Sequence, residues 1–258
     1  SGREWMGTGI ARSMLRYGRT DMSSRNASFH DGVVAGALLA PLKFLFALSL
    51  ALFGILLAAW IIDWVFVFKV WPEGVARLKN ILAADLGRGI ELAAWQGGGA
   101  GAVTGTANFL YGLVFRFTGI HDMGVRFAES AALSIPDTIV RNFYIANREA
   151  IEVAMIGTQL LGVRLATLGM TVPLLFLVYF VGATDGLTQR AIRRACGGRE
   201  SGSLYHRAKH LQVALIVVAV LTVLLWPLLT DIRWIGLPLT AALGILSRLQ
   251  WAYYKKHL

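Results

Sequence analysis

Three stretches of the chain are apolar over the length of a membrane-spanning helix. Residues 44–62, 165–184 and 210–230 run for 19, 20 and 21 positions without Lys, Arg, Asp or Glu. An α-helix rises about 1.5 Å per residue, so about 20 residues cross a hydrocarbon core about 30 Å thick. Three such stretches predict a polytopic membrane protein and argue against a soluble protein with buried helices.

A fourth uncharged run, residues 234–247, has only 14 positions. It continues through Arg248 to Trp251, and a long arginine side chain can reach the polar surface of a membrane from within the bilayer. We therefore interpret 234–251 as a fourth span that forms a hairpin with the third. The sequence thus predicts an all-α integral membrane protein with about four transmembrane helices and a long helical segment outside the membrane between the first and the second.

The chain carries 25 Lys and Arg against 15 Asp and Glu, and this excess lies on one side of the predicted spans. Residues 1–43, 185–210 and 247–258 have net charges of +3, +4 and +3, whereas the segment 72–164 has eight basic and eight acidic residues. Cytoplasmic loops carry the excess of Lys and Arg in membrane proteins. Both termini and the loop 185–210 are therefore predicted to be cytoplasmic, and 72–164 to lie outside.

This topology divides the chain into six parts. They are a basic cytoplasmic N-terminal arm (1–43), the first transmembrane helix (44–71), the outside helical segment (72–164), the second transmembrane helix (165–184), an Arg-rich cytoplasmic loop (185–210) and a transmembrane hairpin of helices three and four with a cytoplasmic tail (211–258). The Gly-rich uncharged stretch 92–115 would break the charge rule if it spanned, so we reject it as a span. A helix packed along the membrane face and a re-entrant piece remain open for it, and the small residues at 97, 101 and 105 favour close helix–helix approach.

The predicted cytoplasmic loop holds the candidates for a binding site. Asp185 can cap a short helix on which Arg190, Arg193 and Arg194 share one face, and Gly197-Gly198 ends that helix. These arginines can bind DNA phosphate, lipid head groups or an acidic protein surface, or can serve only to orient the spans. The residues that we expect to contact a partner are Asp185, Arg190, Arg193, Arg194, Arg199, Glu200, Tyr205 and His206.

Signals for catalysis or for a metal are weak. His206 and His210 have the spacing of two ligands on one helix face, but two cations lie between them and no glutamate base does. The glycines at 97–101 lack the Gly-Lys-Ser/Thr of a phosphate-binding loop. Asp63 and Lys69 lie at the end of the first span, where anchoring at the interface accounts for them, and no ionisable residue lies mid-span, which argues against an ion-coupled transporter. We expect no catalytic residue, metal or cofactor.

A motif in residues 185–209 resembles a known protein family. It consists of Asp185-Gly186-Leu187-x-Gln189-Arg190-x-Ile192-Arg193-Arg194, followed by Gly197-Gly198-Arg199-Glu200-Ser201 and then by Tyr205-His206-x-Ala208-Lys209. The family comprises inner-membrane proteins that are encoded on bacterial integrating conjugative elements and on some conjugative plasmids. These proteins are classified as a domain of unknown function. The layout of one anchor, a long outside segment and a terminal hairpin extends the resemblance over most of the chain.

The resemblance implies a multi-pass protein of the bacterial inner membrane whose segment 72–164 is periplasmic. It also implies a part in conjugative type IV secretion beside the coupling ATPase that brings DNA to the channel, and, because the family has no established reaction, no catalytic residue. We therefore expect a non-enzymatic component that contacts membrane lipids and docks the coupling ATPase or other type IV secretion subunits; a homo-oligomer and direct DNA contact stay open. The alternative is an integral-membrane enzyme acting on lipid or cell-wall precursors at the inner face, with His206 and Glu200 as acid and base.

Overall fold

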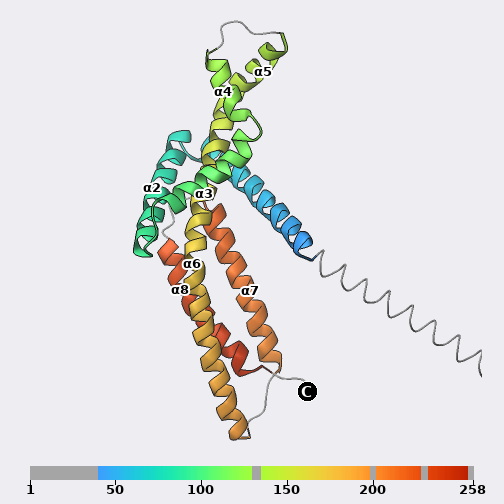
Figure 1. The fold of residues 1–258 in the computed structure, drawn as a ribbon, viewed down its shortest axis with the longest axis vertical. Coiled ribbons are helices and arrows are strands. Elements are labelled where there is room, and N and C mark those ends of the chain that lie inside the picture. The colour runs from blue at the N-terminus through green and yellow to red at the C-terminus, as the bar shows by residue number, and fades with distance from the viewer. Residues whose placement is uncertain (1–39, 130–134, 198–201, 228–231, 255–258) are drawn as a thin grey trace, which may run out of the picture. The chain divides into compact units, whose positions relative to one another are not determined.

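The structure, a computed structural model, shows an all-helical protein (Figure 1). It describes residues 40–129, 135–197, 202–227 and 232–254. Within these residues the backbone is helical apart from short turns and contains no strand, which confirms the predicted all-α class. The chain separates into two compact units, Ser1–Gly54 and Ile55–Leu258, and all packing described below belongs to the second. Most of the predicted arm 1–43 lies outside the described residues.

The described elements follow one another as helices joined by short turns. After the long helix Ala40–Val70, which ends in the π-helical turn η1 (Phe66–Val70), the order is α2 (Val75–Trp95), α3 (Gly101–Tyr111), η2 (Gly112–Arg116), α4 (Ile120–Glu129), α5 (Ile135–Ala146), α6 (Arg148–Ala195), α7 (Gly202–Leu225) and α8 (Ile232–Ala252). The first helix stops at Trp71, whose N–H donates to the carbonyl oxygen of Phe66 at 2.7 Å. Pro72 follows and has no backbone N–H with which to continue the helix.

Three helices in the described part of the chain are long and apolar enough to cross a membrane. They are Ala40–Val70, Arg148–Ala195 and Ser203–Leu225, and they overlap the three long uncharged stretches of the sequence. The helix expected for the fourth span is present as α8 and packs against α7, but it is not among these three. Its uncharged run is short and contains Pro238. The fourth span therefore stays a prediction.

The second predicted span is part of a much longer helix. α6 runs through 48 residues from Arg148 to Ala195, which is about 72 Å at 1.5 Å per residue. A hydrocarbon core takes up only about 30 Å of that length. α6 therefore extends into both polar segments that flank the span, and the expected boundaries at 164/165 and 184/185 are changes of composition rather than helix ends.

The Gly-rich stretch 92–115 forms a helical hairpin. It contains the end of α2, a turn in which Gly97 has a φ of 74°, and α3, and both helices pack against the first part of α6. A φ in this region favours glycine because other residues are strained there. The packing of this hairpin on α6 is compatible with both alternatives that the sequence leaves open, and its position relative to a membrane stays a prediction.

Close approach of this hairpin to α6 depends on glycines other than those expected. A Cβ on Gly162 would meet the backbone of Ala107, and a Cβ on Gly89 would lie 3.1 Å from the Cγ2 of Thr167. The glycines at 97, 101 and 105 have no such neighbour within 4 Å. The predicted contact through these three residues is therefore wrong, because sequence spacing does not show which face of α3 meets α6.

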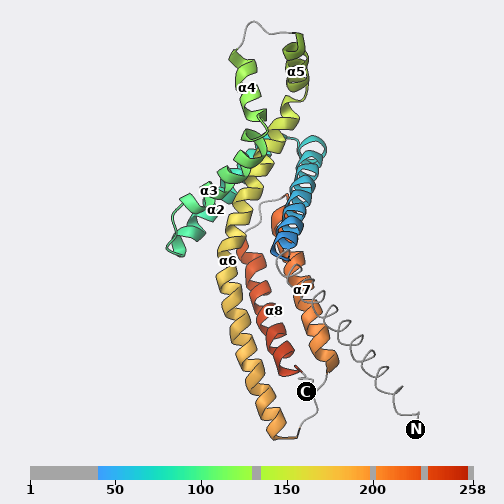
Figure 2. The ribbon, with the colours of Figure 1, turned by 45° about the vertical axis from the view of Figure 1, so that its right-hand side comes forward.

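The second part of α6 packs against α8, and α8 packs against α7 (Figure 2). Gly182 makes the close contact with α8, because a Cβ there would collide with Ser247 and with the carbonyl oxygen of Gly244. Ser247 is fully buried, and its hydroxyl donates to the carbonyl oxygen of Tyr179 at 3.0 Å. α6 thus packs against α8 at a small residue and through one hydrogen bond, as is common between membrane helices.

We predict that Gly182→Ala lowers the melting temperature of the protein in detergent, because the new methyl group would collide with the backbone of α8. Such overpacking costs about 1–3 kcal/mol. Gly169→Ala on the same helix is the matched control, since nothing lies within 4 Å of the added Cβ and alanine favours a helix over glycine by up to about 1 kcal/mol. Equal effects of the two substitutions would contradict this packing.

Candidate functional site

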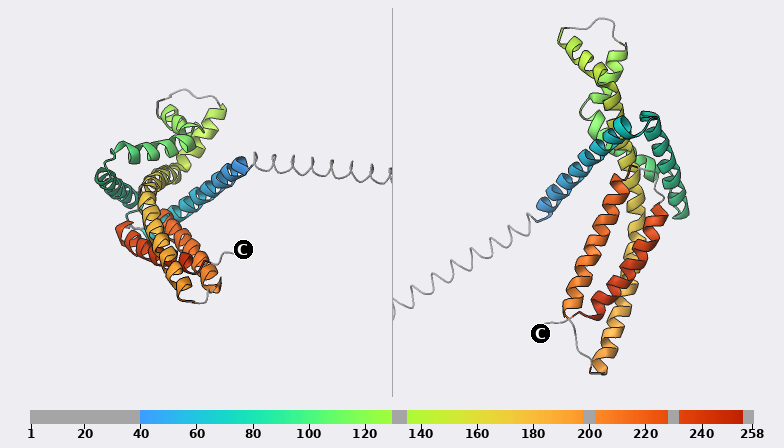
Figure 3. Two further views of the ribbon diagram at one scale, coloured as in Figure 1. Left: turned by 60° about the horizontal axis from the view of Figure 1, so that its bottom comes forward. Right: turned by 180° about the vertical axis from the view of Figure 1, so that it is seen from behind.

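The end of α6, the beginning of α7 and the end of α8 meet at one end of the second unit (Figure 3). Five side chains gather there, and we name them the arginine–tyrosine cluster: Arg190, Arg193, Tyr205, Tyr253 and Tyr254. Three of them, Arg190, Arg193 and Tyr205, were expected to contact a partner. The two tyrosines at the end of α8 join them only in the folded chain.

Both arginines of the cluster lie against the rings of the two tyrosines that follow α8. The guanidinium carbon of Arg193 is 4.1 Å from the ring centre of Tyr253, and its Nη1 donates to the carbonyl oxygen of Ala252 at 3.2 Å. The guanidinium carbon of Arg190 is 5.2 Å from the ring centre of Tyr254. Cation–π contacts of this kind stabilise by about 0.5–1 kcal/mol each at exposed sites. The last turn of α8 is therefore held on α6 by two arginines.

Asp185 does not begin a helix. It lies within α6, and its carboxylate pairs with the Nε of Arg248 on α8 at 2.7 Å, with both side chains half exposed. The expected cap at Asp185 is wrong, because the helix continues from the span without a break. The expected end of this helix is confirmed: α6 stops at Ala195, and Gly197 follows with a φ of 70°, as is usual after a helix C-terminus.

The remaining predicted contact residues divide into three kinds. Tyr205 has its ring 5.5 Å from that of Tyr254 and 5.2 Å from the imidazole of His206, so it belongs to the packed cluster. Arg194 and His206 are exposed. Arg199 and Glu200 lie outside the described residues. In the described part of the chain, no three His, Cys, Asp or Glu side chains lie together as ligands for a metal ion.

A second polar site, which the sequence pattern did not predict, is centred on Arg164. This arginine borders the uncharged run of the second span, yet it is only 6% exposed. Its Nε donates to Oδ2 of Asp85 at 2.9 Å, and its Nη1 donates to the carbonyl oxygen of Trp226 at 2.7 Å. One side chain of α6 thus binds α2 and the end of α7.

The sequence does contain a signal for this site. Asp85 shares the buried face of α2 with Leu78, Ile81, Gly89 and Ala93, at the spacing of successive helical turns. A carboxylate on an otherwise apolar face needs a partner, because a buried charge without one is costly. The partner could not be identified from the sequence, since Arg164 is 79 residues away.

Asp63 corrects a further expectation. It was placed at the membrane interface as an anchor, but its side chain is only 6% exposed and faces α6, where a Cβ on Gly157 would lie 2.5 Å from its Oδ2. Two neighbouring tryptophans also face α6. The indole Nε1 of Trp60 donates to the hydroxyl of Thr158 at 3.0 Å, and that of Trp64 donates to the carbonyl oxygen of Ala150 at 3.1 Å. This part of the first helix is therefore a packed surface.

Tyr111 connects α3 to α4 beyond this surface. Its hydroxyl oxygen lies 2.8 Å from Nδ1 of His121, and its ring is 5.4 Å from that of Phe115. Burial raises the pKa of the Tyr111 phenol above its ordinary value, because a phenolate would lose its contact with water. The phenol is therefore neutral at physiological pH and serves as a fixed packing group.

We predict that Asp85→Asn destabilises the protein by about 3–5 kcal/mol, because it leaves the guanidinium of Arg164 buried without its counter-charge. Thermal unfolding in detergent would show this as a large fall in melting temperature. Glu152→Gln is the matched control, since Glu152 pairs with Lys79 at 2.6 Å on the surface and exposed pairs contribute at most about 1 kcal/mol. A fall in melting temperature no larger than that of the control would show that the buried pair does not hold α2 on α6.

The comparison with known proteins agrees with the conjugation-associated resemblance of the loop motif. A family model described as IncC plasmid conjugative DNA transfer protein DtrJ-like matches residues 71–255, which include every element from α2 to α8. No curated protein and no solved structure matches the chain. Because the family match covers most of the sequence, the chain belongs to the DtrJ-like family of conjugative DNA transfer proteins.

Proposed function

We propose that this chain is a non-enzymatic inner-membrane component of a conjugative type IV secretion apparatus, and that the surface around the arginine–tyrosine cluster docks the coupling ATPase. Membership of a conjugative DNA transfer family supports the first statement, together with three helices that are long and apolar enough to span a membrane. The docking proposal depends on one observation, which is a group of exposed cations on helix ends that are held together by the cluster.

The exposed cations are Arg194 near the end of α6 and Arg207 and Lys209 near the start of α7. The Asp185 carboxylate pairs with Arg248. These exposed cations favour an acidic partner, and the cluster holds their helices in place before a partner arrives. Complementary charge steers association and selects partners, so an acidic face of a protein is the partner that this surface fits.

Arg190 and Arg193 have a different task in this proposal. Their guanidinium groups already lie on Tyr254 and Tyr253. In this proposal the two arginines therefore stabilise the packing beneath the docking surface and do not contact the partner. Of the three motif arginines that the structure describes, Arg190 and Arg193 hold the end of α8 in place, and Arg194 is exposed. Substitution of the first two would disturb the fold of this end, so they are poor tests of docking.

The predicted sidedness can be tested with the single cysteine of the chain. Cys196 is exposed at the end of α6 and belongs to the loop predicted to be cytoplasmic. We predict that a membrane-impermeant maleimide labels Cys196 only after the inner membrane is permeabilised. In a Cys196→Ser background, Phe117→Cys places a thiol at a position that is 90% exposed in the segment predicted to be periplasmic. This control should react in cells with an intact inner membrane, and the reverse pattern would invert the topology.

Docking can be tested by reversing the exposed charges. We predict that Arg194→Glu together with Arg207→Glu lowers co-purification of the coupling ATPase roughly tenfold and lowers conjugative transfer, because like charges then face each other across the interface. The matched control is Arg116→Glu with Arg126→Glu, two exposed arginines on η2 and α4. This control makes the same change in net charge and should leave recovery of the ATPase at the wild-type level.

Other outcomes would assign the surface differently. Equal recovery of the ATPase from both double variants would rule out docking at this surface. If recovery of the ATPase stays equal while the Arg194→Glu and Arg207→Glu variant binds anionic vesicles or DNA less well, the cations bind the phosphate groups of lipid or of DNA. His206→Ala should lower transfer only as far as it lowers recovery of the ATPase; loss of transfer with the complex intact would favour the enzyme alternative.

A further inference from the structure

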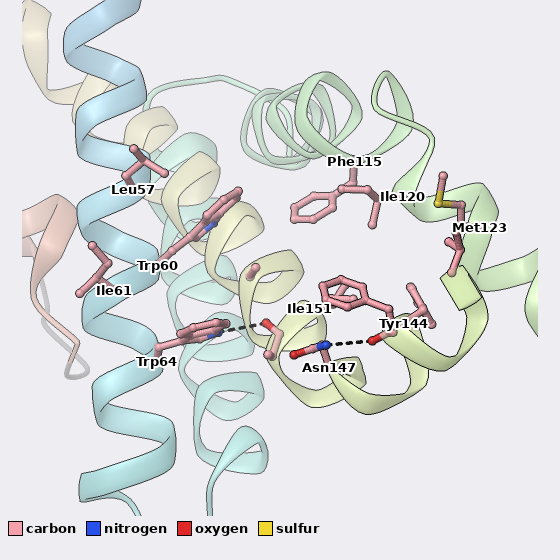
Figure 4. Close-up of a pocket in the computed structure, with 14 residues that line it drawn as sticks. Leu57, Trp60, Ile61, Trp64, Phe115, Ile120, Met123, Tyr144, Asn147 and Ile151 are labelled. Carbon is pink, nitrogen blue, oxygen red and sulfur yellow. Dashed lines mark hydrogen bonds between the residues drawn. The ribbon is translucent and has the colours of Figure 1, made fainter. Parts of the chain in front are cut away.

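A cavity of about 490 Å³ lies at the other end of α6 from the arginine–tyrosine cluster (Figure 4). Its walls come from the helix Ala40–Val70, from η2 and α4, and from α5 with the start of α6. Ala154 of α6 lines it, and Ala154 and Arg190 are separated along α6 by about 54 Å at 1.5 Å per residue. The cavity is therefore independent of the docking surface.

The chemistry of the lining favours an apolar ligand. The polar atoms of the lining side chains are largely used within the protein: Trp60 and Trp64 donate to Thr158 and Ala150, and the Nδ2 of Asn147 donates to the carbonyl oxygen of Phe143 at 2.9 Å. In Figure 4 the rings of Trp60 and Phe115 point into the space between the helices, with their centres 6.0 Å apart. A polar ligand would find few partners in this cavity and would lose its contacts with water.

The cavity also lies where a lipid chain can reach it. Leu57, Trp60 and Ile61 belong to the uncharged run of the first span, and Ile61 is 64% exposed, so this wall continues the surface that faces hydrocarbon when the helix spans a membrane. The opposite wall contains Val140 and Phe143 of α5, outside the candidate spans. An acyl chain could therefore reach the cavity along the apolar surface of the first span.

The volume of the cavity matches one acyl chain. An apolar cavity of about 150 Å³ holds one benzene molecule, and by the same ratio 490 Å³ holds roughly 18–20 carbon atoms, the size of one lipid chain. We propose that this cavity binds one acyl chain of a membrane phospholipid, seated between the first span and the helices α4 and α5.

The test uses the full chain reconstituted in vesicles of phosphatidylethanolamine and phosphatidylglycerol. The probe is a phosphatidylethanolamine with a diazirine in one acyl chain, and crosslinks are mapped by mass spectrometry. Label on α4 and α5 is the informative signal, because these helices lie outside the candidate spans. We expect label on peptides containing Met123, Val140 or Phe143, and we expect Ala154→Phe to reduce it roughly tenfold by filling the cavity.

Two further variants test whether the label depends on the cavity itself. Ala191→Phe makes the same change at an exposed position of α6 and should leave the label on α4 and α5 unchanged. Ile61→Asn places a polar group in the wall at an exposed position, and it should also lower the label. The proposal is overturned if α4 and α5 carry no label while the spans do, if Ala154→Phe and Ala191→Phe are labelled equally, or if a photoreactive residue at Phe143 captures a protein in cells.

Discussion

The continuity of α6 is the constraint on which the rest of the described fold depends. A helix satisfies its backbone hydrogen bonds internally, so one helix of 48 residues can cross a hydrocarbon layer and continue on both sides of it. Its first part carries α2 and α3, and its second part carries α8, which packs against α7. Glycines at 162, 182 and 186 mark places where a neighbouring backbone lies too close for a side chain. These glycines mark where α3 and α8 come closest to α6.

Arg164 adds a polar constraint to this apolar packing. A buried guanidinium is tolerated only when its donors are satisfied, so α2 and the end of α7 are tied to α6 at one point through Asp85 and Trp226. Apolar contacts alone would allow the hairpin of α2 and α3 to slide along α6, because they are non-directional. The ion pair requires one register. Its contribution is therefore specificity of arrangement more than net stability.

The two ends of α6 differ in chemistry in a way that suits two different neighbours. At one end, guanidinium groups stacked on Tyr253 and Tyr254 leave further cations exposed, which suits an acidic protein surface. At the other end, the indole N–H groups of Trp60 and Trp64 donate hydrogen bonds within the protein. The lining of the cavity is otherwise largely apolar, which suits lipid. The proposed acidic protein partner and the proposed lipid chain therefore belong to opposite ends of α6.

The sequence by itself determined the properties that depend on neighbouring residues: the lengths of the apolar runs, the uneven distribution of cations and the helix end at Gly197 all follow from local composition and backbone preference. It also placed Arg190 and Arg193 on one helix face. Only the tertiary structure decided what these side chains meet. Arg193 reaches Ala252 across 59 residues, and Arg164 reaches Asp85 across 79. Asp63, next to the same kind of apolar run, is buried against α6. Periodicity reports which face of a helix is apolar, but the partner of a buried charge is set by contacts between distant segments, which local pattern does not encode.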